Sequence, residues 1–149
     1  MYKNSIFIHG HWWSHLHGKA KSFNKLFWTI AIPWDEDPFE STEYFKNNLK
    51  DWKNYVIIAS SAWAISAIEI ARKFDNISKL IFLNPAIHIN TFNPRCKTKI
   101  FIWTQDGWIS WLYNSSKNVE IIEIEWDHIF SWKEVEINTI IANELKVEI

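Results

Sequence analysis

The sequence predicts an α/β fold, a three-layer αβα sandwich built on a mostly parallel sheet of about six strands. Short runs rich in Ile, Val and Phe alternate with stretches of helical pattern along the 149 residues. These runs are almost continuously apolar, which is typical of strands buried on both faces of a sheet. Strands that alternate with helices form a parallel sheet through right-handed crossovers, with helices covering both faces. The length suits one domain, 1–149.

Each expected strand is a short segment of β-branched and aromatic residues. In chain order the strands are Ser5–Ile8, Thr29–Ile32, Tyr55–Ala59, Lys79–Leu83, Lys99–Ile102 and Val119–Ile124.

Helical patterns occupy the segments between these strands. The expected helices are Lys19–Phe27, Thr42–Leu49, Ala62–Phe74 and Lys133–Lys146, with a weaker signal at Ser110–Ser116. In the third helix, Ile65, Ile68 and Ala71 recur at helical spacing and predict its apolar stripe. The segment Asn84–Lys97 contains two prolines and is expected to be a long connector.

Polar residues follow four of the expected strands. His9 follows the first strand, Ser61 the third, Asp106 the fifth and His128 the sixth. In parallel α/β sheets, ligands bind at the carboxyl ends of the strands. The sequence therefore predicts a functional site at that edge.

Tryptophan is unusually frequent and glycine unusually rare, with 11 tryptophans and 3 glycines. Glycine normally supplies about 7% of residues, because turns need its conformational freedom. Most of the tryptophans lie in expected turns, among them Trp12, Trp34, Trp52, Trp108 and Trp126. We therefore hypothesise that UGA codons that specify glycine in the source organism have been translated as tryptophan. The alternative is a truly tryptophan-rich protein, such as a carbohydrate binder with stacking indoles.

The segment around Ser61 has the outline of a nucleophile elbow, G-x-S-x-G, in which an apolar strand turns sharply at a serine and continues as a helix. Tyr55–Ala59 supplies the strand, and Ala59 and Trp63 occupy the two glycine positions. An indole at position 63 is not expected to fit, because strand and helix approach closely there.

With glycine read at the tryptophan positions, the chain resembles an α/β-hydrolase, specifically the small lid-less bacterial esterases of the YqiA type. Five motifs in order carry the resemblance over most of the chain: His9-Gly10-His11-Trp12-Trp13-Ser14 before Lys19-Ala20, Ser60-Ser61-Ala62-Trp63, Asn84-Pro85-Ala86, Thr104-Gln105-Asp106, and Trp126-Asp127-His128-Ile129-Phe130. The departures from the family pattern are Ala59, Trp63 and Trp126.

The resemblance implies an abbreviated hydrolase fold without a cap domain and a Ser-His-Asp catalytic triad. Ser61 is the implied nucleophile, His128 the general base, and Asp106 the acid that orients the imidazole. The implied oxyanion hole consists of the backbone N–H groups of His11 and Ala62. The implied activity is hydrolysis of small or short-acyl esters through an acyl-enzyme, with no cofactor and no metal.

The implied nucleophile and the implied acid also have alternative explanations. Ser60 is the rival nucleophile, although the count from Ala59 favours Ser61. Ser61 is also a candidate N-cap of the following helix. Asp127 is the rival acid, and Asp106 is also explained as the aspartate of an Asp-Gly turn.

Two other classes of function remain open. A catalytically inactive hydrolase fold used for binding is favoured if the tryptophans are genuine. A metal-binding protein is the other, because four histidines lie within nine residues, His9, His11, His15 and His17.

Composition argues against several other classes. The formal net charge of −1 gives no reason to expect nucleic acid as a partner. No apolar run approaches the roughly 18 residues of a membrane span, and the N-terminus lacks a signal-peptide pattern. The single cysteine, Cys96, suits a reducing cytoplasm. We therefore expect a bacterial cytoplasmic protein that acts on a small-molecule ester.

Overall fold

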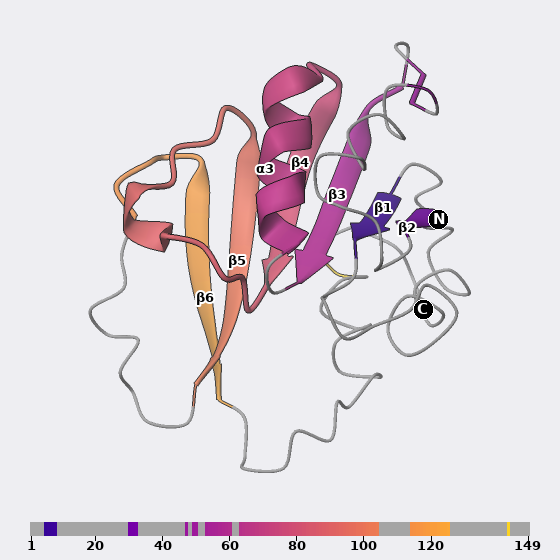
Figure 1. Ribbon diagram of the computed structural model, residues 1–149. Helices are drawn as coiled ribbons and strands as arrows, with labels where there is room; N and C mark the ends of the chain where they lie inside the picture. Colours follow the sequence, from indigo (N-terminus) through magenta and orange to yellow (C-terminus); the bar gives the residue numbers. More distant parts are fainter. Residues whose placement is uncertain are drawn as a thin grey trace.

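The computed structural model describes residues 5–8, 30–32, 47, 49–50, 53–60, 63–104, 114–125 and 143. These residues form an all-parallel sheet with the strand order β2-β1-β3-β4-β5-β6 (Figure 1). The strands are β1 (Ser5–Ile8), β2 (Ile30–Ile32), β3 (Tyr55–Ser60), β4 (Ile77–Leu83), β5 (Lys97–Thr104) and β6 (Val119–Glu125). The chain therefore belongs to the α/β class, as the alternating pattern predicts.

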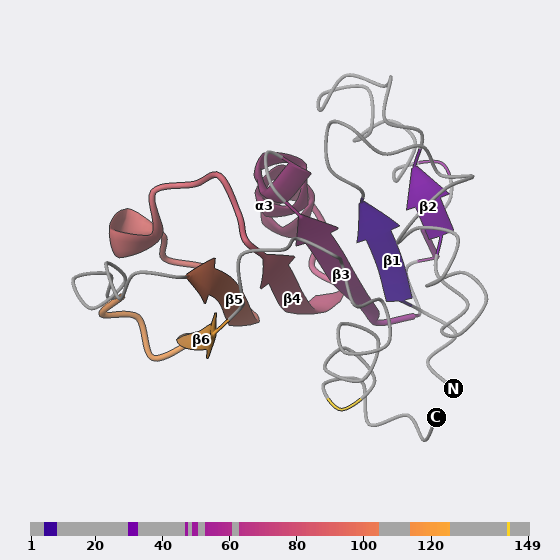
Figure 2. The same cartoon turned by 90° about the horizontal axis from the view of Figure 1, so that it is seen from below.

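Helix α3 (Ala64–Lys73) connects β3 to β4 and packs against one face of the sheet. The short 3₁₀ helix η2 (Ile89–Thr91) interrupts the connector between β4 and β5. Figure 2 shows α3 and η2 on the same face, and Ile89 joins the core cluster under α3. The expected three-layer αβα sandwich remains a prediction, because the described residues place helices on one face only.

Both faces of the central strands are buried. Ile57, Leu80 and Phe82 face α3 and are inaccessible to solvent. Ile58 and Ile81 point to the opposite face, because side chains alternate along a strand, and they are equally buried. This two-sided burial explains why the strands read as continuous apolar runs, as the sequence predicts.

The buried face of α3 differs from the predicted stripe. Ala64, Ala67 and Ile70 are fully buried, whereas Ile65 is 49% exposed. The two alanines lie where the helix crosses the sheet, and their small side chains permit a close approach of helix to strand. The predicted stripe was wrong at Ile65 because a hydrophobicity pattern weights large apolar residues over small ones.

The ends of the elements also differ from prediction. Helix α3 begins two residues later than expected, at Ala64, and β5 extends at both ends to Lys97 and Thr104. Residues 114–116 are not helical, which contradicts the C-terminal part of the weak helix predicted there. The expected helices at 19–27, 42–49 and 133–146 lie outside the described residues, apart from the isolated positions 47, 49 and 143.

Two isoleucines of α3 test the assignment of its buried face. We expect Ile70→Ala to lower the free energy of unfolding by about 2–5 kcal/mol, because it leaves a cavity in the core. Ile65→Ala in the same helix is the control and is expected to change it by less than about 1 kcal/mol, because its side chain is half exposed. Urea denaturation followed by circular dichroism measures both. Equal losses in the two variants would contradict the packing described.

Candidate functional site at the carboxyl edge of the sheet

The carboxyl ends of the strands form the edge at which the sequence predicts the site. Strand β1 ends at Ile8, β3 at Ser60, β5 at Thr104 and β6 at Glu125. The predicted site residues Ser61, Asp106, His128, His11 and Ala62 all lie beyond these ends, outside the described residues. The structure therefore places the strand ends that precede them and leaves the mutual geometry of the triad as a prediction.

The strand order reverses between β1 and β3. The chain proceeds from β1 outward to β2, and then returns to place β3 on the other side of β1. Strands β1 and β3 pair in parallel, with Ile8 opposite Ala59. In open α/β sheets the crevice at such a reversal is where ligands bind. The predicted oxyanion loop and the predicted nucleophile turn thus follow the two strands that flank this point.

The ends of β5 and β6 lie together but apart from β3. Thr104 is the register partner of Glu125, so Asp106 and His128 follow neighbouring strands. Strand β4 separates β5 from β3. At about 4.8 Å between strands, the end of β6 is about 14 Å from the end of β3. A triad requires the segments after β5 and β6 to run back across the edge toward β3.

A strand ends directly before Ser61, and a helix begins three residues after it. Strand β3 ends at Ser60, whose register partner is Leu83 of β4, and α3 starts at Ala64. The residue at the N-cap position of α3 is Trp63, and no side chain caps the helix there. The alternative explanation of Ser61 as the helix N-cap is therefore wrong, because the helix begins two residues later than the sequence suggests.

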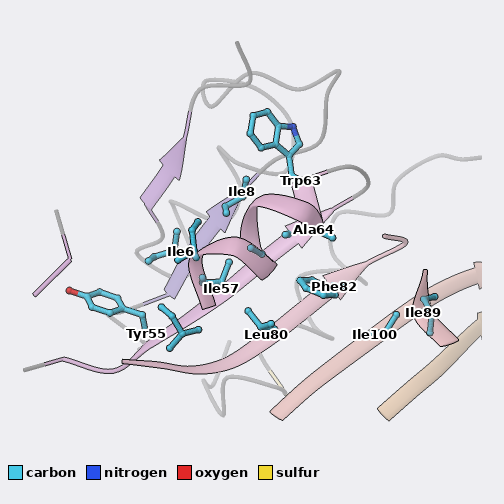
Figure 3. Close-up of a cluster of buried hydrophobic side chains, with 14 of the residues drawn as sticks. Ile6, Ile8, Tyr55, Ile57, Trp63, Ala64, Leu80, Phe82, Ile89 and Ile100 are labelled. Carbon is cyan, nitrogen blue, oxygen red and sulfur yellow. The ribbon is translucent and has the colours of Figure 1, made fainter. Parts of the chain in front are cut away.

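Trp63 occupies the second glycine position of the elbow pattern. Its φ of −71° and ψ of −10° are right-handed helical values, which residues other than glycine adopt readily. Its indole is 5% exposed and belongs to the same cluster as Ile8 and Ala59. Figure 3 shows the indole at the end of this cluster nearest Ile8. The expectation that an indole does not fit here is therefore wrong, because the side chain is accommodated in the core.

Trp103 is the other tryptophan among the described residues. The expected strand ended one residue earlier, at Ile102, but β5 extends through Trp103, which pairs in register with Ile124 of β6. At neither Trp103 nor Trp63 does the backbone take a conformation that requires glycine. The other nine tryptophans lie outside the described residues.

Asn84, the first residue of the Asn84-Pro85-Ala86 motif, has an unusual backbone conformation. It has φ of 49° and is the one residue other than glycine with positive φ in the described part of the chain. It directly follows β4, and its backbone N–H donates to the carbonyl of Phe101 over 2.7 Å. Asparagine is among the residues that tolerate a positive φ best. The chain thus leaves the extended conformation of β4 directly at Asn84. The exposed side chain of Asn84 lies at the carboxyl edge beside the end of β3.

Two substitutions test the conformation of Asn84. We expect Asn84→Val to lower the free energy of unfolding by about 1–2 kcal/mol, because a β-branched side chain is disfavoured at positive φ. Asn84→Gly removes the same carboxamide, yet we expect it to preserve stability, because glycine adopts this conformation without strain. Thermal denaturation of both variants measures the difference. A glycine variant as unstable as the valine variant would show that the side chain, rather than the backbone, matters.

The connector between β4 and β5 is fixed by side-chain amides and a guanidinium. Asn114 donates to the carbonyls of Ile89 and Phe92, over 2.5 and 2.6 Å. Asn118 donates to the carbonyls of Pro94 and Arg95, over 3.1 and 3.3 Å. Each amide nitrogen thus bridges two carbonyls of a segment that has little regular structure of its own.

Arg95 attaches the same connector to the end of α3. Its guanidinium donates to the carbonyls of Ala71 and Arg72, over 3.1 and 2.9 Å, and lies 3.4 Å from Asp75. Carbonyls in the last turn of a helix have no partner within the helix, and a cation there interacts favourably with the helix dipole. The ion pair with Asp75 is exposed and adds little stability by comparison.

Cys96 packs against the core at the start of β5. Its side chain is half-buried and contacts the cluster under α3. Burial raises the pKa of the Cys96 thiol, and the hydroxyl of Thr98 and the charge of Arg95 oppose this only in part. A thiol held in its neutral form is a poor nucleophile. Cys96 is therefore unsuited to nucleophilic catalysis near neutral pH.

The raised pKa of Cys96 predicts two measurements. Near pH 8, the thiol of the folded protein is expected to react with a disulfide reagent more slowly than the same thiol in urea, because less of it is ionised. A pKa that is higher in the folded state than in the unfolded state stabilises the fold below the unfolded pKa. This contribution is lost as the pH rises through the folded pKa. In Cys96→Ser, we expect the free energy of unfolding to lose this dependence on alkaline pH. Equal thiol reactivity in the folded and unfolded chain would contradict a raised pKa of Cys96.

Metal binding and membrane insertion receive no support from the described residues. Within them, no group of three or more His, Cys, Asp or Glu side chains is arranged to hold a metal ion. The histidines His9, His11, His15 and His17 lie outside that part of the chain. No helix in the described segments is long and apolar enough to cross a membrane.

Comparison with protein-family models, with curated proteins and with solved structures finds no match to this chain.

Proposed function

We propose that the protein is a serine hydrolase of the carboxylesterase type, with an abbreviated αβα hydrolase fold of about six strands and no cap. The observation that carries the proposal is the position of Ser61 in the chain between β3 and α3. Strand β3 pairs with β1 at the reversal of strand order, Ser61 directly follows β3, and α3 begins three residues after Ser61. A nucleophile elbow requires a serine between such a strand and such a helix. The crevice at a reversal of strand order is where α/β proteins bind ligands.

In the proposed reaction, the Ser61 hydroxyl attacks the carbonyl carbon of an ester while His128 accepts its proton. The tetrahedral intermediate collapses when the C–O bond breaks, and His128 gives the proton to the leaving alkoxide. Water activated by His128 then hydrolyses the acyl-enzyme and regenerates Ser61. Asp106 orients the imidazole and stabilises its protonated form. Backbone N–H groups of His11 and Ala62 donate to the oxyanion, and each such donor typically contributes about 3 kcal/mol to transition-state stabilisation.

The choice of Ser61 over Ser60 has structural support. Ser60 is the last residue of β3 and pairs in register with Leu83, so it belongs to the strand. The nucleophile of an elbow lies on the turn after the strand, where its hydroxyl is exposed at the edge of the sheet. Ser61 is the next residue. The chain order Ser61, Asp106 and His128 also matches the order of triad residues in α/β-hydrolases.

We further propose that the residue at position 63 of the natural protein is glycine, specified by UGA. The packed indole of Trp63 takes up space at the end of the core nearest Ile8, after which the predicted oxyanion loop begins. Glycine would leave this space to the substrate and to the loop. The composition supports recoding, since 11 tryptophans accompany 3 glycines. We place the enzyme in a bacterial cytoplasm and assign it a short-acyl ester as substrate.

Hydrolysis of p-nitrophenyl acetate tests the proposal. We expect the chain with glycine at all eleven tryptophan positions to turn over this ester, and Ser61→Ala or His128→Ala to lower kcat at least about 1,000-fold. Asp106→Asn is expected to lower kcat with little change in KM, because it acts through the imidazole. Ser115→Ala is a matched control, because this serine is exposed and far along the chain from the elbow.

Three outcomes contradict parts of the proposal. An inactive all-glycine chain, or activity that persists in Ser61→Ala, rules out the serine mechanism. A loss of activity in Ser60→Ala without a loss in Ser61→Ala moves the nucleophile by one residue. Activity that disappears with excess chelator and returns with a metal ion supports the histidine-loop alternative instead. Peptide mass spectrometry of the natural protein decides independently whether position 63 is glycine.

A catalytically inactive binding protein is the second candidate, and the burial of Trp63 is the observation that favours it. An indole packed into the core at the elbow contributes stability, and replacing a buried tryptophan typically costs about 3–5 kcal/mol. Under this alternative, Trp63→Gly destabilises the fold by that amount and creates no esterase activity. Under the hydrolase proposal, glycine at position 63 is required for turnover.

A further inference from the structure

A second concave site lies at the opposite edge of the sheet from the proposed esterase site. A pocket of about 560 Å³ opens at the amino ends of β4, β5 and β6. This volume lies within the range of small-molecule binding pockets. Four lysines and one carboxylate line it, namely Lys79, Lys97, Lys99, Lys117 and Glu120.

The strand register gathers three of these lysines on one face. Lys79 of β4 is the register partner of Lys97 of β5, so their side chains leave neighbouring strands on the same side. Lys99 lies two residues after Lys97 and therefore points to the same face, about 6.6 Å further along the strand. Lys117 belongs to the turn just before β6. The lysines thus converge through the fold and not through sequence proximity.

This face is the one opposite α3. Leu80 follows Lys79 and Ile100 follows Lys99, and both are buried in the cluster under α3. Since side chains alternate along each strand, Lys79 and Lys99 point away from that cluster. Val56 of β3 is the register partner of Lys79, and its buried side chain closes one side of the pocket.

The uncharged polar groups of the pocket are occupied within the protein. The Ser78 hydroxyl donates to the Tyr55 carbonyl over 3.2 Å, and the Thr98 hydroxyl donates to the Cys96 carbonyl over 3.2 Å. The Asn118 amide is held by the β4–β5 connector. The charges of Lys97 and Lys117 are therefore the groups of this pocket that are best suited to bind a ligand.

The positive charge of the pocket exceeds the negative charge that lines it. Glu120 lies 3.7 Å from the Lys99 ammonium. In the described part of the chain, neither Lys97 nor Lys117 forms an ion pair. Lys79 and Lys97 are register partners, so they place two positive charges on the same side of neighbouring strands. An anion bound between the strands would be attracted by both charges.

We propose that this pocket binds a small phosphorylated molecule that carries at least two negative charges. Lysine ammonium groups bind phosphate as compact point charges, and several in one concavity select a multiply charged anion. The concave shape and limited volume favour a small molecule over an extended polymer. The site lies at the amino edge of the sheet, so it is independent of the hydrolase reaction proposed at the carboxyl edge.

Isothermal titration calorimetry with inorganic tripolyphosphate at low ionic strength tests the site. We expect saturable binding to the full chain, and a Kd at least tenfold higher for Lys97→Glu. Lys73→Glu makes the same charge change on an exposed position of α3 and is expected to change the Kd less than twofold, because it lies outside the pocket. Added salt is expected to weaken binding by screening the charges.

The variant Lys97→Glu is designed to fold. It places a carboxylate opposite Lys79, which replaces a like-charged cross-strand pair by an opposite-charged one, and we expect an unchanged or higher midpoint of thermal unfolding. Three results would overturn the proposal. They are an absence of binding to the unchanged protein at millimolar tripolyphosphate, equal losses in Lys97→Glu and Lys73→Glu, and equal affinity for citrate and tripolyphosphate.

Discussion

The parallel pairing of β1 with β3, which sets Ile8 opposite Ala59, is the contact on which the rest of the arrangement depends. Because β2 lies outside β1, this pairing reverses the direction in which the sheet grows, and β4, β5 and β6 follow in order on the other side. The ends of β1 and β3 become neighbours although about fifty residues separate them in sequence. The predicted oxyanion residue His11 and the predicted nucleophile Ser61 follow these two strand ends, so their predicted proximity depends on this contact.

Helix α3 packs closely on β3. Ala64 and Ala67 have small side chains that let the helix approach the strand, and the indole of Trp63, directly before the helix, is buried in the same cluster. Glycine at position 63 would exchange this apolar contact for open volume at the edge of the sheet. The residue at position 63 therefore decides whether this volume is part of the core.

The sequence predicted the strands well because strands buried on both faces consist of nearly continuous runs of Ile, Val and Phe. It predicted their ends less well, since strand pairing extends β5 to Lys97 and Thr104, beyond the expected strand Lys99–Ile102. The expected stripe of α3 was wrong at Ile65, which is exposed, whereas Ile68 and Ala71 pack against the core as predicted. At the site, the sequence indicated the strand before Ser61 and the helix after it. The lysine pocket was not predicted, because Lys79 and Lys97 become neighbours only through the register of two strands.

The amides of Asn114 and Asn118 make the β4–β5 connector sensitive to chemical ageing. Each amide nitrogen donates to two carbonyl oxygens. Deamidation converts the amide to a carboxylate, which only accepts hydrogen bonds when ionised. The former donor would then face the same carbonyls as a negatively charged acceptor, and attraction would become repulsion. Exchange of one amide nitrogen for oxygen would thus weaken the attachment of the connector 84–96, which also carries Arg95 and its contacts with the end of α3.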